Sequence, residues 1–159
     1  MKYTDAEVTF REFPDEISLC INISNCKHHC KGCHSPELWK DVGNWLDGRS
    51  LSRLIESNKG ITCVGFMGGD YNPSMITTLA AIVKNNYKLK VGWYSGEEEI
   101  SPDILLTWFD YIKIGPYIEE KGPLNNPNTN QRMYQIIKLK EKIIKEDITY
   151  KFWNNEKQN

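Results

Sequence analysis

The chain has 159 residues and a formal net charge of -1, from 20 Lys and Arg against 21 Asp and Glu. With 40% hydrophobic residues it can bury a core, so we expect one domain over residues 1–153 and a polar tail over 154–159. Proteins that bind nucleic-acid phosphates usually carry an excess of basic residues, which this chain lacks. No apolar run approaches the roughly 20 residues of a membrane-spanning helix. We therefore expect a cytoplasmic protein with no nucleic-acid and no membrane partner.

The predicted elements alternate between strands and helices as far as residue 115. Residues 16–24 alternate apolar side chains with small polar ones, which is typical of a strand whose second face lines a site. In chain order we then predict a helix over 50–58 capped by Ser50, a buried strand over 61–67, a helix over 74–85, a strand over 89–94, a helix from Pro102 to about Trp108 and a strand over 111–114.

The last quarter of the chain has a weaker pattern. Residues 119–130 are polar with two prolines, which indicates a loop. Residues 131–150 fit one helix or two strands, and 148–153 fit a final strand. The repeated order of strand, loop and helix favours an α/β fold with a mainly parallel sheet. A complete eight-fold βα barrel needs about 200 residues or more, so a barrel of this length would be partial and open.

The most informative feature is a group of cysteines after the first predicted parallel strand. Cys26, Cys30 and Cys33 form a C-x3-C-x2-C motif, and three thiolates this close can wrap one metal centre. Iron–sulfur clusters are held by cysteine thiolates, and a cubane with three protein ligands keeps one iron open to a small molecule. The total of five cysteines is odd, which argues against a disulfide framework.

Two further interpretations of these cysteines stay open on spacing alone. A structural zinc site would need a fourth ligand, which His28, His29 or His34 could supply, although no distant Cys or His pair accompanies them. The thiols could also serve packing or redox chemistry. Cys20 and Cys63 lie within apolar strands, where we expect them to be small core residues.

The other loops with special chemistry also follow predicted strands. Gly68-Gly69-Asp70 follows the second parallel strand, Ser95-Gly96 the third and Gly115-Pro116 the fourth. In parallel α/β folds, ligands bind at the carboxyl ends of the strands, so these loops should share one rim. Two glycines let the backbone approach a ligand, and Asp70 can accept from an ammonium or hydroxyl group, although Gly-Gly-Asp alone also fits an ordinary turn.

From about Glu7 to Trp153, the chain resembles the radical S-adenosylmethionine (SAM) superfamily, and within it the activating proteins of anaerobic ribonucleoside-triphosphate reductase. The matching motifs are Cys26-x3-Cys30-x2-Cys33, Gly32-Cys33-His34-Ser35-Pro36-Glu37-Leu38-Trp39, Gly68-Gly69-Asp70, Asp110 through Gly115-Pro116-Tyr117, and Asn130-Gln131-Arg132. The resemblance implies a partial βα barrel of the radical SAM type. It also implies two cofactors, a 4Fe-4S cluster on the three cysteines and SAM on its open iron.

The activity implied by this resemblance is reductive cleavage of SAM to methionine and a 5′-deoxyadenosyl radical, which then makes a glycyl radical on the large reductase. A flavodoxin- or ferredoxin-type protein would donate the electron. The resemblance assigns the SAM amino group to Gly68, Gly69 and Asp70. Further SAM contacts are expected at His34 with the adenine, at Ser95 with the ribose or carboxylate, and at Asn130, which could instead touch the partner or cap the next element. We expect His28 and His29 to be exposed loop residues.

Three positions depart from the family pattern. Ser35 replaces a frequent Asn, Ile114 replaces a frequent acid, and Asp70 replaces the longer Glu of many superfamily members. These departures keep open an inactive family member. The sequence is also compatible with an activase of another glycyl-radical enzyme, with a small radical SAM enzyme acting on a metabolite, and with a zinc-stabilised binding module without enzyme activity.

Overall fold

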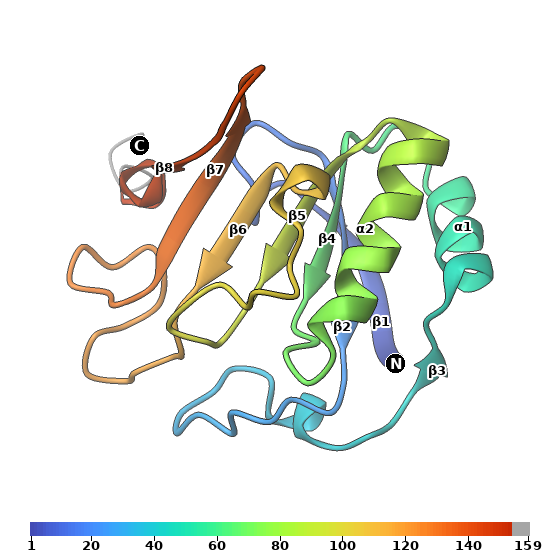
Figure 1. The fold of residues 1–159 in the computed structure, drawn as a ribbon. Helices are drawn as coiled ribbons and strands as arrows, with labels where there is room; N and C mark the ends of the chain where they lie inside the picture. The colour runs from blue at the N-terminus through green and yellow to red at the C-terminus, as the bar shows by residue number, and fades with distance from the viewer. Residues whose placement is uncertain (154–159) are drawn as a thin grey trace.

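The computed structural model describes residues 1–153, so the predicted tail at 154–159 lies outside the described residues. Eight strands form one sheet in the order β3-β1-β2-β4-β5-β6-β7-β8 (Figure 1). The strands are β1 (Lys2–Thr9), β2 (Ser18–Ile23), β3 (Asn44–Trp45), β4 (Cys63–Met67), β5 (Lys90–Tyr94), β6 (Tyr111–Ile114), β7 (Arg132–Lys138) and β8 (Ile143–Asp147). The α-helices are α1 (Gly48–Ser57) and α2 (Pro73–Tyr87), and short 3₁₀ helices are η1 (Pro36–Trp39), η2 (Leu106–Trp108) and η3 (Thr149–Phe152).

The centre of the sheet is parallel and its two sides are antiparallel. Strands β2, β4, β5 and β6 run parallel, as predicted for these four segments. However, β1 and β3 on one side and β7 and β8 on the other pair in antiparallel fashion, so the described sheet is mixed rather than mainly parallel. The connections from β1 to β2 and from β7 to β8 are too short for a parallel crossover, which takes about a dozen residues or more.

The two faces of the sheet bury different side chains. Helices α1 and α2 cover one face (Figure 1), where alternate strand residues such as Leu19, Phe66 and Trp93 form the larger core. On the opposite face a smaller core gathers around Phe13 and Tyr111. Because successive side chains of a strand point to opposite faces, each parallel strand contributes to both cores.

Phe13 packs where two neighbouring strands carry glycine. Gly65 on β4 and Gly92 on β5 are register partners, and Phe13 above them is fully buried. A Cβ on Gly92 would lie only 2.1 Å from Phe13 Cε1, and one on Gly65 only 2.5 Å from its Cε2. The absence of side chains at both positions therefore makes the space that the phenyl ring fills.

The N-cap of the first helix lies three residues before the predicted cap. Asp47 is the N-cap of α1: its Oδ1 accepts a hydrogen bond from Ser50 N at 2.8 Å, and Asp47 N donates to Ser50 Oγ at 2.9 Å. The prediction that Ser50 caps the helix was wrong, because Ser50 is the third helical residue of a reciprocal capping box.

The predicted helix from Pro102 to Trp108 is wrong except for η2 at its end. The reason is a hydroxyl of α2. Thr77 Oγ1 donates to Asp103 O at 2.9 Å and accepts from Leu105 N at 3.2 Å. These backbone groups are thus bonded to α2 rather than to the partners that a helix would give them within the segment.

Of the two predictions for residues 131–150, two strands is correct. Strands β7 and β8 form a hairpin, but the final strand predicted over 148–153 is wrong, because residues 149–152 form η3. Thr149 Oγ1 accepts from Met133 N at 2.9 Å, and Thr149 N donates to Asp147 Oδ1 at 2.9 Å. These local hydrogen bonds turn the chain away from the strand pairing of the sheet.

Within the described part of the chain, no helix has both the length and the apolar character of a membrane span.

Candidate functional site

A row of four side chains crosses the carboxyl ends of the parallel strands. Asn22, Met67, Tyr94 and Lys113 are successive register partners on β2, β4, β5 and β6. All four line a cavity of about 880 Å³, which also has Cys33 and His34 in its wall. This volume falls in the range of about 300–1,000 Å³ that is usual for small-molecule and cofactor sites.

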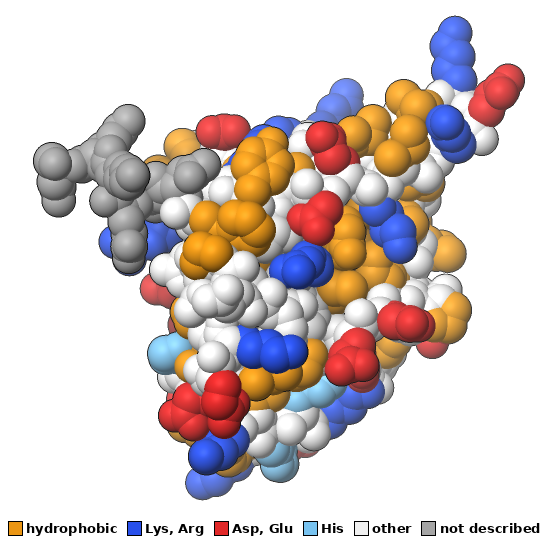
Figure 2. Space-filling model, turned by 90° about the vertical axis from the view of Figure 1, so that its left-hand side faces the viewer, with side chains coloured by type: hydrophobic (Ala, Val, Ile, Leu, Met, Phe, Trp, Pro, Cys, Tyr) orange, Lys and Arg blue, Asp and Glu red, His pale blue; other side chains and the backbone are white. Residues whose placement is uncertain are grey.

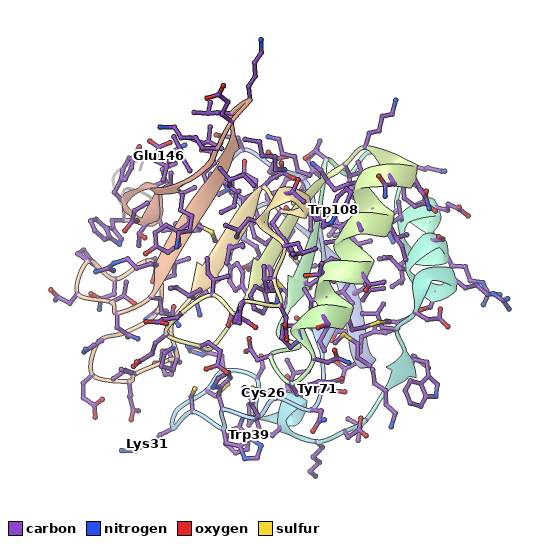
Figure 3. The ribbon with its side chains drawn as sticks, viewed as in Figure 1. Cys26, Lys31, Trp39, Tyr71, Trp108 and Glu146 are labelled. Carbon is purple, nitrogen blue, oxygen red and sulfur yellow. The ribbon has the colours of Figure 1, made fainter. Side chains whose placement is uncertain are left out.

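The cysteine loop, residues 24–35, lies across these strand ends. Figure 1 shows this loop directly after β2, on the side towards which β4, β5 and β6 run, and Figure 3 shows Cys26 and Lys31 on it. The loop is closed at its base by Cys26 N, which donates to Leu38 O at 2.8 Å. Within it, Cys33 N donates to Cys30 O at 3.1 Å, and Gly32 between them has a φ of +72° that favours glycine. The predicted loop therefore stands where the sequence placed it.

The three thiols of the cysteine loop are less buried than the thiols of Cys20 and Cys63. Cys26, Cys30 and Cys33 are free and half-buried, whereas Cys20 and Cys63 are free and fully buried. Burial raises the pKa of the Cys63 thiol to about 12 and that of Cys20 further still. This agrees with the prediction that Cys20 and Cys63 are core residues, and it leaves the three loop cysteines as the candidate thiolate donors.

The chemistry of this donor set fits an iron–sulfur cluster, since its three thiols are unpaired and lie on one short loop beside a cavity. In residues 1–153 of the protein alone, no three His, Cys, Asp or Glu side chains are arranged as the ligands of a metal ion.

Asp70 is held by the loop after β5. Its Oδ1 accepts from Ser95 Oγ at 2.6 Å and its Oδ2 accepts from Gly96 N at 2.9 Å. The glycines before it have φ values of +100° at Gly68 and +91° at Gly69, and a Cβ on Gly69 would lie 2.7 Å from Ile76 Cδ1. Two glycines are therefore needed to present this carboxylate at the end of β4.

The structure corrects the expectation for His28. The expectation of an exposed residue holds for His29, but His28 Nε2 lies 2.9 Å from Asp70 Oδ2 and only 16% of the side chain is exposed. A Cβ on Gly96 would lie 2.5 Å from His28 Cδ2, so the glycine makes room for the imidazole ring. His28 thereby ties the cysteine loop to the Gly-Gly-Asp turn.

Asp70 also lines a second, smaller cavity of about 580 Å³. The wall of this cavity includes Trp93 and an acidic run, Glu97 to Glu99. Lys27 of the cysteine loop forms an ion pair with Glu97, and this pair raises the pKa of Lys27 and lowers that of Glu97. The two cavities flank the loop, with Asp70 in one and Cys33 in the other.

The remaining predicted site residues fall in different places. Ser95 is buried against Asp70, as described above. His34 lines the larger cavity with its ring centroid 5.4 Å from that of Tyr117. Asn130 lines neither cavity: its Nδ2 donates to Pro116 O at 3.0 Å, and its buried Oδ1 has no hydrogen-bond partner among residues 1–153.

Sequence reasoning missed Lys113. This lysine lies on β6, is only 7% exposed, and lines the larger cavity with Cys33. Burial lowers its pKa to about 8. The sequence does contain a signal for it, because Lys113 stands between two isoleucines in a short apolar strand. Burying a charged side chain there costs free energy unless a partner compensates the charge, which marks the position as a candidate site residue.

Fold and site together define an α/β protein with a three-cysteine motif at the carboxyl ends of its parallel strands. A family model described as a 4Fe-4S single cluster domain matches residues 17–137. Because this match covers most of the chain, the protein belongs to that family and is an iron–sulfur protein. This match supports the interpretation of the cysteine motif as an iron–sulfur cluster site over its interpretation as a zinc site. Neither the search of curated proteins nor the search of solved structures found a match.

Proposed function

We propose that this protein is a radical SAM activase with a partial, open βα barrel of that superfamily's type. It would generate a glycyl radical on an anaerobic ribonucleoside-triphosphate reductase, using one electron from a flavodoxin- or ferredoxin-type donor in the cytoplasm. The observation that carries the proposal is the row of strand-end residues lining one cavity of about 880 Å³ together with Cys33 and His34. A cavity of this size beside a three-cysteine cluster motif suits a nucleoside-containing ligand.

Cys26, Cys30 and Cys33 would hold three irons of the cluster and leave the fourth open. When bound, this group would supply one electron to the SAM sulfonium, whose carbon–sulfur bond would break to give methionine and a 5′-deoxyadenosyl radical. Hydrogen transfer from a glycine Cα of the partner would then give 5′-deoxyadenosine and the glycyl radical. The protein's part is to position these groups and to exclude competing reactions.

Asp70, which lines the smaller cavity on the other side of the cysteine loop, is the residue that we propose for the SAM ammonium group. Its carboxylate already accepts from Ser95 Oγ and Gly96 N, which fixes its orientation. A charged acceptor with fixed orientation holds an ammonium more strongly than a neutral one does. His34, in the wall that Cys33 shares, is proposed beside the adenine.

The test is anaerobic reconstitution with iron and sulfide, followed by dithionite and SAM, with 5′-deoxyadenosine as the product assayed. Wild-type protein is compared with Cys26→Ala, Cys30→Ala and Cys33→Ala, and Cys63→Ala serves as the control because its thiol lies in the core. We expect product from the wild type and the control only. A candidate reductase added to the active protein should then show a glycyl radical by electron paramagnetic resonance.

Two outcomes would contradict the SAM chemistry. Stoichiometric zinc with no iron–sulfur absorbance would favour a zinc-stabilised binding module. A stable cluster without any 5′-deoxyadenosine product would show that the protein binds an iron–sulfur cluster but does not cleave SAM. A product without a glycyl radical on the reductase would contradict the proposed partner and move the proposal to another glycyl-radical enzyme or to a metabolite substrate.

A further inference from the structure

Lys113 is a buried cation without an acidic partner. Its Nζ donates to Gly115 O at 2.9 Å and to Ser95 O at 3.4 Å, both neutral carbonyl groups. None of the ion pairs within residues 1–153, defined by an N–O separation of 4.0 Å or less, includes Lys113. A buried ammonium group is costly unless an opposite charge compensates it, and Lys113 has only carbonyl oxygens within hydrogen-bond distance.

The cysteine loop reaches the cavity that Lys113 lines. Lys113 and Cys33 line the same cavity. Burial is the largest influence on Lys113 and lowers its pKa, while negative charge at Asp70, Cys30, Cys33 and Glu12 acts in the opposite direction. Because Lys113 and Cys33 border the same cavity, a charged group held by Cys33 would interact with the Lys113 ammonium.

We propose that the Lys113 ammonium is the buried counter-charge of the iron–sulfur cluster and makes this cluster easier to reduce. One-electron reduction adds one negative charge to the cluster, and the electron comes from an external donor. A fixed cation nearby stabilises the reduced form more than the oxidised form, and this raises the reduction potential. This inference rests on the cluster being held by the three loop cysteines but not on the cleavage of SAM.

The other lysines near the motif are poorly placed for this task. Lys31 is next to Cys30 in the chain, but its side chain is 86% exposed and lies 3.6 Å from Glu119. Lys27 is half exposed and paired with Glu97. Solvent and a paired carboxylate screen both charges, whereas Lys113 is only 7% exposed and forms no ion pair within residues 1–153.

The experiment is an anaerobic redox titration of the reconstituted cluster, followed by electron paramagnetic resonance. Wild type is compared with Lys113→Met, Lys113→Gln and the charge-conserving Lys113→Arg, and Lys31→Met is the control for an exposed lysine of the cysteine loop. At the potential that half-reduces the wild type, we expect the reduced fraction of the Met and Gln variants to fall about twofold or more. Lys31→Met and Lys113→Arg should stay close to the wild type.

Neutral replacements at this position are expected to fold, because they remove a buried charge rather than create one. Iron and sulfide contents equal to those of the wild type confirm that each variant holds the cluster. Unchanged reduced fractions in the Met and Gln variants, or an equal fall in Lys31→Met, would overturn the inference. If the potential shifts while the wild type makes no 5′-deoxyadenosine, the inference stands and the proposed activase function fails.

Discussion

His28 Nε2 lies 2.9 Å from Asp70 Oδ2, although the two residues are 42 positions apart in the chain. His28 stands between the first and second cysteines of the motif, and Asp70 ends the Gly-Gly-Asp turn after β4. The proposed cluster ligands and the proposed ammonium acceptor are therefore linked through one direct contact. A ligand ammonium that binds Asp70 must share this carboxylate with His28 or displace it.

Removing the charge of Asp70 should weaken SAM binding. Asp70→Asn keeps the shape and one acceptor oxygen, so Ser95 can still donate to it, but the ion pair with the ligand is lost. A hydrogen bond to a charged group contributes about 1.5–3 kcal/mol, which corresponds to roughly 10–100-fold in the dissociation constant. Anaerobic calorimetry on the reconstituted protein measures this change.

The control for this prediction is Asp103→Asn, which removes the charge of an exposed side chain on the loop before η2. Its dissociation constant for SAM should equal that of the wild type. If Asp70→Asn binds SAM as tightly as the control, Asp70 does not receive the ammonium group.

Loss of any one loop cysteine should strongly reduce cluster content. Cys26→Ser, Cys30→Ser and Cys33→Ser each remove one of the three proposed thiolate ligands, and a hydroxyl group is a much poorer ligand for iron. We expect iron and sulfide per chain to fall severalfold. Cys20→Ala, which alters a buried thiol outside the loop, should bind as much iron as the wild type, and equal loss in this variant would indicate general misfolding.

Lys113 should make the apoprotein more stable as the pH rises. Its pKa is about 8 in the folded protein against an ordinary 10.5, so between these values the unfolded chain binds more protons than the folded chain. The free energy of unfolding then increases with pH across this window, by about 3 kcal/mol in total for this group. Below pH 8 both states are protonated and this group adds no slope.

Other buried groups titrate in the same window and in the opposite direction, because burial raises the pKa of Cys20, Cys63 and Tyr111. The measurement is therefore the difference between wild type and Lys113→Met in urea unfolding at several pH values from 7 to 10.5. Asp70, Glu12 and the loop cysteines face Lys113 and are common to both proteins. A difference that stays constant with pH would contradict the lowered pKa.

Gly92→Ala should destabilise the protein. The added Cβ would lie 2.1 Å from Phe13 Cε1, and this ring is fully buried and cannot move into solvent. Overpacking of this kind costs about 1–3 kcal/mol, measured by denaturant unfolding. In the double variant with Phe13→Ala the clash is absent, so the combined loss should be smaller than the sum of the two single losses. Additive losses would show that Gly92 and Phe13 are not coupled.

The surface near the C-terminal strands has no single chemical character. Figure 2 views the molecule from the left-hand side of Figure 1 and shows hydrophobic side chains interspersed with acidic and basic ones. Histidine side chains are visible towards the lower end of this face. Because the three histidines of the chain all belong to the cysteine loop, they mark the end of the molecule where the candidate site lies.

The sequence predicted those elements whose pattern is local. The strands β2, β4, β5 and β6 and the helices α1 and α2 follow from apolar periodicity, and the cysteine loop follows from the spacing of its thiols. The segment after Pro102 was mispredicted because Thr77, 26 residues earlier than Asp103, captures its backbone groups. Long-range hydrogen bonds of this kind leave no periodic signal in the segment that they reshape.

The sequence by itself determined that the chain has a cysteine motif for one cluster and that its glycine-rich loops follow parallel strands. Only the tertiary structure decided which of these groups meet. It placed His28 against Asp70, and it aligned Asn22, Met67, Tyr94 and Lys113 in one row beside Cys33. The reason is physical: strand register and the course of loops are set by pairing and packing between distant segments, which residue spacing along one segment does not encode.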